Sequence, residues 1–371
     1  MLTVLHVGKY YPPAPGGMER VVEMLCSATR GRLTSLVLAF NLGRHTVHDQ
    51  VDGVSVTRVG TIGRAGSVPI GPGFPRELRR AQADVMIVHE PNPSALVAIL
   101  AARPRIPYAV WFHSDVIRPW LQYRLFYEPV ARPVYRGARR FAVSSPALAE
   151  ASPILRHYAD RVRVIPFGIS PDQWRATPSI SAASEAKRSR DRRPIVLFVG
   201  RLVPYKGVHV LIEAASTLPV RLVIVGDGPL RASLEVQARN VPRTASIEFA
   251  GEASDADVKS WMHAATLLAL PSVTRAEAFG YVQLEAMASG VPVISTNVSS
   301  GVPWVNQHEV TGLVVTPGDA AALRTAIARI TSDGALRARL GAAGVARVRS
   351  EFGMATMADR FVDLCESVAR A

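Results

Sequence analysis

The sequence is poor in several features that would each point to a class of protein. Its 371 residues include two cysteines, Cys26 and Cys365, which lie near opposite ends of the chain. So few cysteines argue against a disulfide framework and favour buried, reduced thiols in a cytoplasmic protein. No apolar run approaches the roughly 20 residues of a membrane-spanning helix. The start, MLTVLHVGKY, lacks the charged beginning and cleavage site of a signal peptide, so we interpret it as a buried strand.

Three further features are absent or scarce. The dinucleotide fingerprint G-x-G-x-x-G does not occur, no cluster of ligating side chains predicts a metal centre, and none of the known nucleic-acid-binding modules is present. Acidic residues are outnumbered, with a net charge of +13, and residues 1–180 hold 22 Lys and Arg against 12 Asp and Glu. The remaining residues hold 21 against 18. A basic field attracts phosphates of nucleic acid, anionic lipid or a diphosphate substrate, although a general preference for arginine explains it equally well.

Short apolar segments alternate with helix-like segments along the whole chain. This alternation predicts an α/β protein with parallel sheets covered on both faces, whose ligands bind beyond the carboxyl ends of the strands. The length suffices for two domains with separate cores. Residues 179–193 form a polar tract without an apolar period, which predicts a linker. We therefore predict a first domain over residues 1–178, a linker over 179–193, a second domain over 194–353 and a final helix over 354–371.

One stretch, PSVTRAEAFGYVQLEAMASGVPVIST (271–296), places two carboxylates eight positions apart. We expect Glu277 at a loop–helix junction, where the backbone N–H groups of Ala278, Phe279 and Gly280 are free. Glu285 is expected about two turns further along the same helix. A carboxylate accepts a hydrogen bond from a sugar hydroxyl, while a free N–H donates one to a neighbouring sugar oxygen. This combination therefore suits a polyhydroxylated ligand. The alternative is a capping carboxylate followed by a solvated helix residue.

The second half begins with an apolar strand followed by Arg201-Leu-Val-Pro-Tyr-Lys206-Gly207. Arg201 and Lys206 bracket a turn at a strand end, on what we expect to be an exposed loop, where two cations can grip a diphosphate from two sides. The alternative is a pair of solvated loop cations. Gly226 and Gly251 also follow strands, so we place them beside the same diphosphate-bearing ligand.

In the first half, the loop GKYYPPAPGGM leads from the first strand into a helix. Its Gly16 and Gly17 allow close backbone approach by a phosphate at a helix start. His113 ends a later strand in the sequence WFHSD, a position from which a side chain reaches a ligand of a parallel sheet. A lone histidine is more often structural, but its place at this end of a strand favours a functional role.

Residues 116–140 interleave aromatic residues, including Trp120, with arginines, including Arg132, Arg136, Arg139 and Arg140. Such a stretch is typical of an anchor on an anionic membrane. It is equally typical of a core helix with a solvated basic side, and less so of a stacking surface for nucleic acid. The sequence leaves these readings open.

Together these motifs resemble glycosyltransferase family 4. The resemblance covers the whole chain and lies mainly in VGR-x4-KG, in Glu277-x7-Glu285 with its following ASGVPV, in PP-x-x-GG-x-E and in WFHSD. The last form is similar to bacterial polysaccharide mannosyltransferases. IPFGIS resembles the family's IPNG turn, with Phe167 in place of asparagine. The resemblance implies a GT-B fold, in which two Rossmann-like domains face a cleft and the last helix returns to the first domain.

The resemblance also implies a retaining transfer from a nucleotide diphosphate sugar, with GDP-mannose favoured, to a glycan or polyprenyl-diphosphate-linked acceptor. Arg201 and Lys206 would stabilise the diphosphate without a metal ion or other cofactor, Glu277 and the following N–H groups would hold the sugar, and Glu285 the ribose. Gly16 and Gly17 would approach the phosphate and His113 the sugar. No nucleophile is evident, so a front-face mechanism is expected.

Three alternatives to this reading remain at the level of sequence. A UDP-sugar-dependent transferase of the same family and a nucleotide-sugar epimerase on the same fold use the same motifs. A non-catalytic protein that binds phosphate-rich ligands would instead show strongly salt-dependent binding without selectivity for nucleotide sugars. For the transferase we expect a cytoplasmic protein that makes peripheral contact with the inner face of the membrane.

Overall fold

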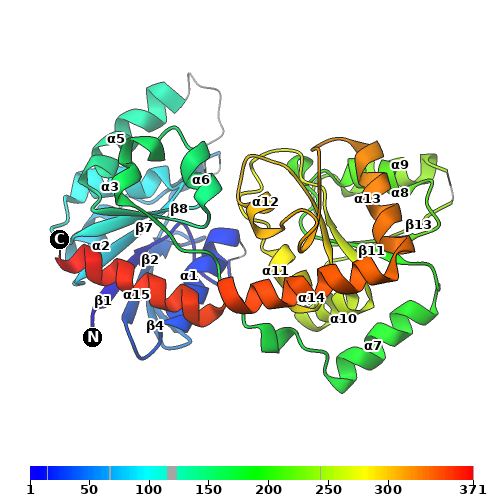
Figure 1. Cartoon of the computed structure of the whole chain (residues 1–371). Helices are drawn as coiled ribbons and strands as arrows, with labels where there is room; N and C mark the ends of the chain where they lie inside the picture. The colour runs from blue at the N-terminus through cyan, green and yellow to red at the C-terminus, as the bar shows by residue number, and fades with distance from the viewer. Residues whose placement is uncertain (15, 67, 115–122, 243, 371) are drawn as a thin grey trace. The chain divides into compact units, whose positions relative to one another are not determined.

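The computed structural model describes residues 1–14, 16–66, 68–114, 123–242 and 244–370 (Figure 1). The chain divides into two compact units. Unit 1 comprises residues 1–167 and 354–371, and unit 2 comprises residues 168–353. Each unit contains one predominantly parallel sheet with helices, as the alternation of strands and helices predicted.

Unit 1 has an eight-stranded sheet in the order β10-β9-β8-β7-β1-β2-β4-β3. Every neighbouring pair in it is parallel except β3 and β4, which form a hairpin that the sequence pattern did not reveal. The strands are β1 Thr3–Val7, β2 Thr34–Phe40, β3 Val47–Val51, β4 Val54–Val59, β7 Val85–Glu90, β8 Tyr108–Phe112, β9 Arg140–Val143 and β10 Val162–Val164. A separate small hairpin pairs β5 Gly63–Ala65 with β6 Val68–Ile70. The direction of winding reverses between β1 and β7, which makes this a switch point of a doubly wound sheet.

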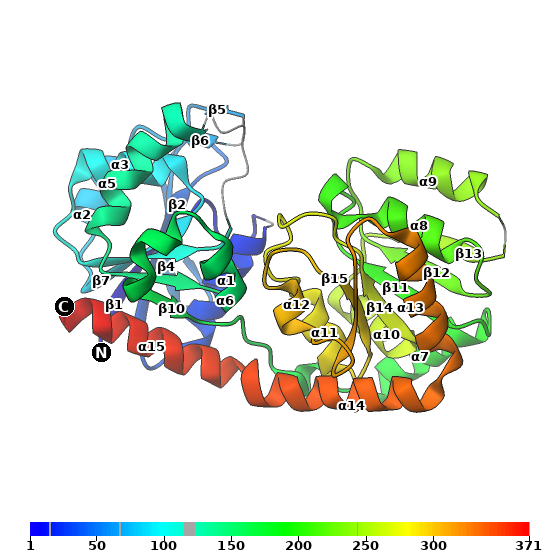
Figure 2. The same ribbon diagram turned by 45° about the horizontal axis from the view of Figure 1, so that its top comes forward.

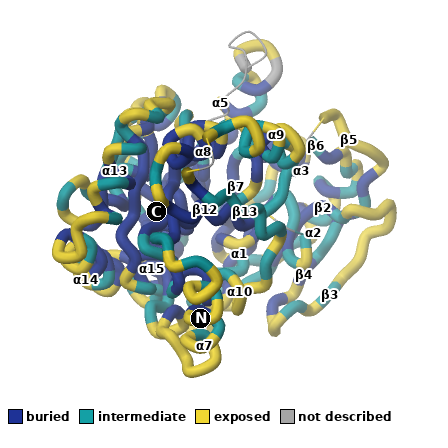
Figure 3. The backbone as a smooth tube through the Cα atoms, turned by 90° about the vertical axis from the view of Figure 1, so that its right-hand side faces the viewer, coloured by how far each residue is buried: buried dark blue, intermediate teal, exposed yellow. Residues whose placement is uncertain are grey.

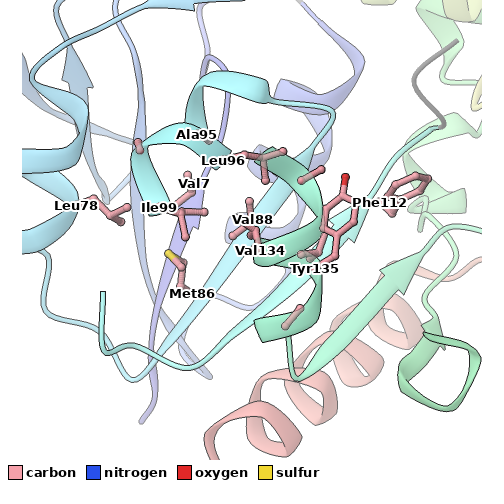
Figure 4. Packing of buried hydrophobic residues seen from close by; sticks show 14 of the residues in the cluster. Val7, Leu78, Met86, Val88, Ala95, Leu96, Ile99, Phe112, Val134 and Tyr135 are labelled. Carbon is pink, nitrogen blue, oxygen red and sulfur yellow. The ribbon is translucent and has the colours of Figure 1, made fainter. Parts of the chain in front are cut away.

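The central strands of this sheet are apolar at nearly every position, so both of their faces need to be covered. Helices cover both faces. The helices are α1 Gly17–Ala28, α2 Phe74–Arg80, α3 Pro93–Ala102, α5 Glu128–Gly137, α6 Pro146–Ala151 and α15 Met354–Arg370. One face packs Met86 and Val88 of β7 under Leu96 of α3 and Val134 of α5 (Figure 4). On the other face α15 contacts β7, β8 and β9 (Figure 2). Both cysteines are buried and free, as the sequence predicted.

Unit 2 has a six-stranded parallel sheet in the order β13-β12-β11-β14-β15-β16. The strands are β11 Ile195–Val199, β12 Arg221–Val225, β13 Ser246–Gly251, β14 Leu267–Leu270, β15 Val293–Thr296 and β16 Gly312–Val315. The helices are α7 Pro178–Ser189, α8 Val208–Ala215, α9 Arg231–Asn240, α10 Asp255–Ala264, α11 Val282–Ala288, α12 Val302–Val305, α13 Ala320–Ser332 and α14 Gly334–Glu351. Its switch point lies between β11 and β14. Short turns complete the chain: π-helical Tyr123–Tyr127 and 3-10 turns Leu155–Arg161, Pro171–Trp174 and Pro204–Lys206.

The predicted linker over 179–193 was wrong in its structure. Most of this tract forms helix α7, which belongs to unit 2 and packs against α10, while its outer side is exposed (Figure 3). The buried contacts of α7 are polar: the hydroxyl of Ser184 donates to the carbonyl of Ser260, and the ammonium of Lys187 lies over the ring of Trp261. A helix that docks through serine and lysine has no apolar stripe, so the usual signal of an amphipathic helix is missing. The boundary between the units accordingly falls at residues 167 and 168 instead of 178.

Candidate active site

In unit 2 the predicted residues meet at the carboxyl edge of the sheet. Strand β11 ends just before Gly200 and Arg201, and β12 ends just before Gly226. Gly226 has φ +125°, and a Cβ there would lie 2.2 Å from the carbonyl oxygen of Gly200. Any side chain at Gly226 would therefore push the two strand ends apart. Gly251, at φ +74°, ends β13 beside it, and its carbonyl accepts from the N–H of Gly226 at 2.7 Å.

Lys206 and Glu277 form an ion pair, although they come from loops that follow different strands. The backbone N–H of Val273 donates to the carbonyl of Tyr205 at 2.8 Å, which holds the loop after β14 against the loop after β11. The hydroxyl of Ser272 donates to Glu277 Oε2 at 3.2 Å. The result is a cation–carboxylate pair directly above the switch point, where open α/β sheets bind their ligands.

Arg201 and Lys206 differ in environment, contrary to the expectation that both lie on an exposed loop. Arg201 is exposed and makes no ion pair with any residue that the structure describes. The side chain of Lys206 is only 13% exposed and is held by Glu277, which is equally covered. A ligand can therefore recruit Arg201 freely, whereas it must compete with Glu277 for Lys206.

The loop before α11 offers backbone donors beside Glu277. Within the described ranges, the N–H groups of Ala278 and Gly280 have no hydrogen-bond acceptor. Phe279 between them is buried and packs against Trp304 and Phe352. Gly280, at φ +72°, adopts a left-handed conformation that a side chain would strain. These features leave two of the three donors that the sequence predicted next to a carboxylate.

Glu285 lies in α11 and is 6% exposed. The expectation that it sits two turns into the helix was wrong, because α11 begins only at Val282 and places Glu285 in its first turn. The late start follows from the turn at residues 278–281, where Gly280 is left-handed and interrupts helical geometry. A carboxylate in a first turn is favoured by the helix dipole.

In unit 1, Gly16 and Gly17 stand at the start of α1 and have different surroundings. A Cβ on Gly16 would lie 1.9 Å from the carboxylate of Glu19, whereas a Cβ on Gly17 would have no atom within 4 Å. Glu19 is buried, and this burial raises its pKa above the ordinary value. A side chain at Gly16 would therefore have to displace the carboxylate of Glu19, while the space at Gly17 is open.

His113 follows β8 and is 8% exposed. Its Nε2 lies 3.0 Å from Nδ1 of His89, whose Nε2 lies 3.1 Å from Nδ1 of His6. The sequence pointed to His113 but not to this chain of three histidines. A usable signal was present, because His6 and His89 each lie in an apolar strand near its carboxyl end.

Glu90 ends β7 on the opposite face from His89 and is fully buried. Its Oε2 accepts from the hydroxyls of Tyr127 and Tyr135, and its Oε1 has no partner in the described part of the chain. Burial raises the pKa of Glu90 to about 7. Sequence reasoning assigned this carboxyl group no role, because no spacing connects it to the two tyrosines.

Residues 115–122, Trp120 among them, lie outside the described part of the basic aromatic stretch. The part that is described contains a core helix. In α5, Val134 and Tyr135 are buried, whereas Arg132 and Arg136 are exposed. Arg139 lies partly buried and donates to the carbonyl of Val368 in α15.

Across the described residues, no helix is both long and apolar enough to cross a membrane. The same residues contain no group of three or more His, Cys, Asp or Glu arranged to hold a metal ion.

Comparisons with known proteins agree with this arrangement. Residues 179–347 match the family model described as Glycosyl transferases group 1, and residues 16–168 match the one described as Glycosyl transferase 4-like domain. The chain is 31% identical to D-rhamnosyltransferase WbpZ of Pseudomonas aeruginosa over 337 residues, 88% of this chain and 86% of the relative. It is 29% identical to O-antigen chain mannosyltransferase C of Escherichia coli over 375 residues, 98% of each chain.

Among solved structures, the chain resembles that of Anabaena Alr3699/HepE in complex with UDP-glucose. The TM-score is 0.79 and the sequence identity 22%, with both chains covered completely (100%). A likeness at this identity concerns the fold. It confirms two Rossmann-like units of the GT-B type, as the sequence predicted.

Proposed function

The chain belongs to the glycosyl transferases of group 1, and we propose that it is a retaining transferase that moves a hexose from a nucleotide diphosphate sugar. The acceptor in this proposal is a glycan or a polyprenyl-diphosphate-linked oligosaccharide of a cell-surface polysaccharide. The observation that carries the proposal is the meeting of Lys206 and Glu277 beside Arg201 at the switch point of unit 2. Two cations and a carboxylate at one place suit a ligand with both a diphosphate and hydroxyl groups.

The proposed roles follow from these positions. Arg201 and Lys206 bind the diphosphate and stabilise the negative charge that develops on it as the bond to the sugar breaks. Glu277 then exchanges its contact with Lys206 for sugar hydroxyls, and the N–H groups of Ala278 and Gly280 donate to sugar oxygens beside it. Glu285 binds the ribose, and Gly226 and Gly251 lie along the nucleotide.

We propose that Gly17 gives a phosphate close access to the start of α1 and that His113 contacts the sugar. The leaving phosphate deprotonates the acceptor on the same face, because no side chain is placed as a nucleophile in the proposed scheme. We further propose that transfer needs no metal ion, since Arg201 and Lys206 supply the positive charge. Full activity after treatment with a chelator is the expected result.

Mannose is the favoured sugar, and GDP-mannose the favoured donor. This preference is supported by the likeness to a relative named as a mannosyltransferase, together with the WFHSD form at His113. A UDP-sugar is the second candidate, because the solved structure reported above holds UDP-glucose. The two donors differ in the base, so a direct comparison separates them.

A thermal-shift panel of GDP- and UDP-sugars tests the donor, because a ligand that binds the folded state raises the melting temperature. The preferred donor is then incubated with and without a lipid-linked acceptor. Conversion of the sugar without acceptor identifies an epimerase. Transfer that leaves the anomeric configuration unchanged, as read by NMR of the product, supports the proposal, whereas an inverted product contradicts the retaining mechanism.

We also propose a cytoplasmic protein that contacts an anionic membrane through the outer side of α5. Arg132 and Arg136 are exposed there, and Leu125 just before it is 57% exposed. Each basic residue near an anionic surface contributes about 1 kcal/mol. Sedimentation with anionic liposomes should fall for Arg132→Gln/Arg136→Gln but not for Arg239→Gln/Arg349→Gln, two exposed arginines of unit 2. Equal sedimentation of both variants would assign α5 to its core role alone.

A further inference from the structure

Three histidines lie in a row on one face of the unit 1 sheet. Strands β8, β7 and β1 are consecutive neighbours in that sheet (Figure 1). His6 is opposite Ile87, and His89 is opposite Trp111. Because side chains two positions apart in a strand share a face, His6, His89 and Trp111 point to the same side. His113, two positions after Trp111, continues this row beyond the end of β8.

The three rings are joined by hydrogen bonds and stacked. Nδ1 of His6 is 3.1 Å from Nε2 of His89, and Nδ1 of His89 is 3.0 Å from Nε2 of His113. Their ring centroids are 5.4 and 5.3 Å apart, with interplanar angles of 20° and 24°. Phe361 of α15 stacks on His6 at 5.6 Å and covers that end of the row. Packing thus holds every ring of the row in one orientation.

The two ends of the row differ. Nε2 of His6 is buried and has no hydrogen-bond partner in the part of the chain that the structure describes. Nδ1 of His113 likewise bonds to no described group, but His113 is the one member of the row that retains some exposure. The His6 end of the row is therefore sealed inside the unit, whereas the His113 end keeps a small exposed fraction.

All three rings are neutral near pH 7. Burial lowers the pKa of His6 and of His113 to about 3, and it lowers the pKa of His89 well below its ordinary value. A neutral imidazole has one N–H donor and one bare acceptor nitrogen. Each hydrogen bond in the row therefore links the proton positions of two rings, and the whole row has two consistent arrangements.

In the first arrangement every Nδ1 carries the proton, so that His6 donates to His89, His89 donates to His113, and His113 presents an N–H outward. In the second every Nε2 carries it, the bonds run in reverse, and His113 presents a bare nitrogen. The second arrangement leaves an N–H of His6 buried without an acceptor, which is rarer in proteins than an unpaired acceptor and costs the desolvation of a donor. The sealed end thus favours the first arrangement.

We propose that His6 and His89 are positioning residues, which hold the ring of His113 and make its Nδ1 an N–H donor to an oxygen of the bound sugar. The identity of the ligand rests on the proposed function, but the proton arrangement does not. The hydrogen bond that one nitrogen of a histidine makes decides what the other nitrogen offers. Here the proton position on His6 sets that on His89, which in turn sets that on His113, across three neighbouring strands.

The test combines NMR of the full chain labelled with 15N-histidine and transfer kinetics. Long-range 1H–15N correlations distinguish the two neutral forms of each ring, and His113→Gln identifies the signals of His113. The expected result is an Nδ1–H form at His113 without any ligand. An Nε2–H form there would overturn the proposal, whatever the enzyme transfers.

Two variants at one position separate positioning from folding. His6→Asn places an amide N–H where Nδ1–H stood, and His6→Phe keeps an aromatic ring against Phe361 but removes the donor. In His6→Phe, Nε2 of His89 becomes the sealed end, so the Nδ1–H form at His113 should persist, but the rings of His89 and His113 lose the contact that orients them. This variant should therefore lower kcat by about tenfold or more, as misplacement of a contact group does, while His6→Asn should retain the rate. The exposed His45→Gln is the control. If His6→Phe folds and leaves kcat unchanged, the positioning role of His6 is wrong.

The proposed function has a separate outcome in the same experiment. If His113→Gln transfers sugar at the rate of the unmodified enzyme, the contact between His113 and the sugar is refuted together with the catalytic part of the inference. The NMR result on the proton arrangement would stand in that case. If His6→Phe fails to fold, His89→Gln, whose amide has both a donor and an acceptor, is expected to keep the fold and reduce the Nδ1–H population at His113.

Discussion

At the scale of single residues, the ion pair between Lys206 and Glu277 matters most. Each side chain is nearly covered, and each lies against the opposite charge of the other. Removing one member of a covered pair leaves the other without compensation, which costs more than the pair contributed. The pair therefore links ligand binding to the stability of unit 2, and Arg201 outside it does not.

Arg201→Ala and Lys206→Ala should consequently behave differently. Both should lower transfer by about 10²-fold or more, because each removes a group that stabilises developing charge. Only Lys206→Ala should also lower the melting temperature. The double variant Lys206→Met/Glu277→Gln should recover stability without recovering transfer. Melting curves and initial rates on the same preparations check this, and a normal rate for Arg201→Ala would refute its role.

The two glutamates should separate kinetically. Glu277→Gln keeps the size and loses the charge, so it should mainly lower kcat, since its contacts to the sugar change as the bond breaks. Glu285→Ala should mainly raise the KM for the donor, because a ribose contact is similar in the ground and transition states. Donor saturation curves provide the measurement. An unchanged donor affinity for Glu285→Ala would remove the ribose from its assignment.

At the scale of elements, the junction of the glycine loop and α1 offers a clean contrast. Gly17 has open space where a Cβ would stand, so Gly17→Ala should keep the melting temperature. The added methyl group should nevertheless raise the KM for the donor if a phosphate approaches there. Gly63→Ala, also in open space but in the β5–β6 hairpin, is the matched control and should change neither quantity. An equal effect of both substitutions would remove Gly17 from the site.

At the scale of the whole molecule, two groups of unit 1 make stability depend on pH in opposite directions. Burial raises the pKa of Glu90 from 4.5 to about 7, so its contribution is fully present below pH 4.5 and is lost as the pH rises to 7. Burial lowers the pKa of His6 from 6.5 to about 3, so its contribution is present above pH 6.5 and is lost as the pH falls. Both contributions to stability therefore change with pH between pH 4.5 and 6.5, in opposite directions.

Glu90→Gln should isolate the first of these effects. The amide oxygen can still accept from Tyr127 and Tyr135, but it no longer titrates. The melting temperature of the variant relative to the unmodified protein should therefore rise between pH 5 and pH 8. A difference that stays constant over this range would show that Glu90 is ionised in the folded protein at pH 5.

Much of the site could be read from sequence because it depends on neighbours along the chain. Arg201 follows an apolar strand and a glycine, and Glu277 stands between a strand and a helix. Such local patterns identify strand ends, and in parallel sheets strand ends are where ligands bind. The same local reading failed for α7, whose docking face is polar, and for the start of α11, which Gly280 delays.

The sequence by itself determined the two α/β units, the positions of most of their strands, and the residues at the strand ends, since periodicity and turn residues are local properties. Only the tertiary structure decided which of those residues meet. The pairing of Lys206 with Glu277 depends on β14 returning beside β11, and the row of His6, His89 and His113 depends on the register of three strands. The contacts of Lys206 with Glu277 and of His6 with His89 join residues more than 70 positions apart in sequence. The contact of His89 with His113 joins consecutive strands across helix α3. All three arise because the winding of a sheet brings the ends of its strands together.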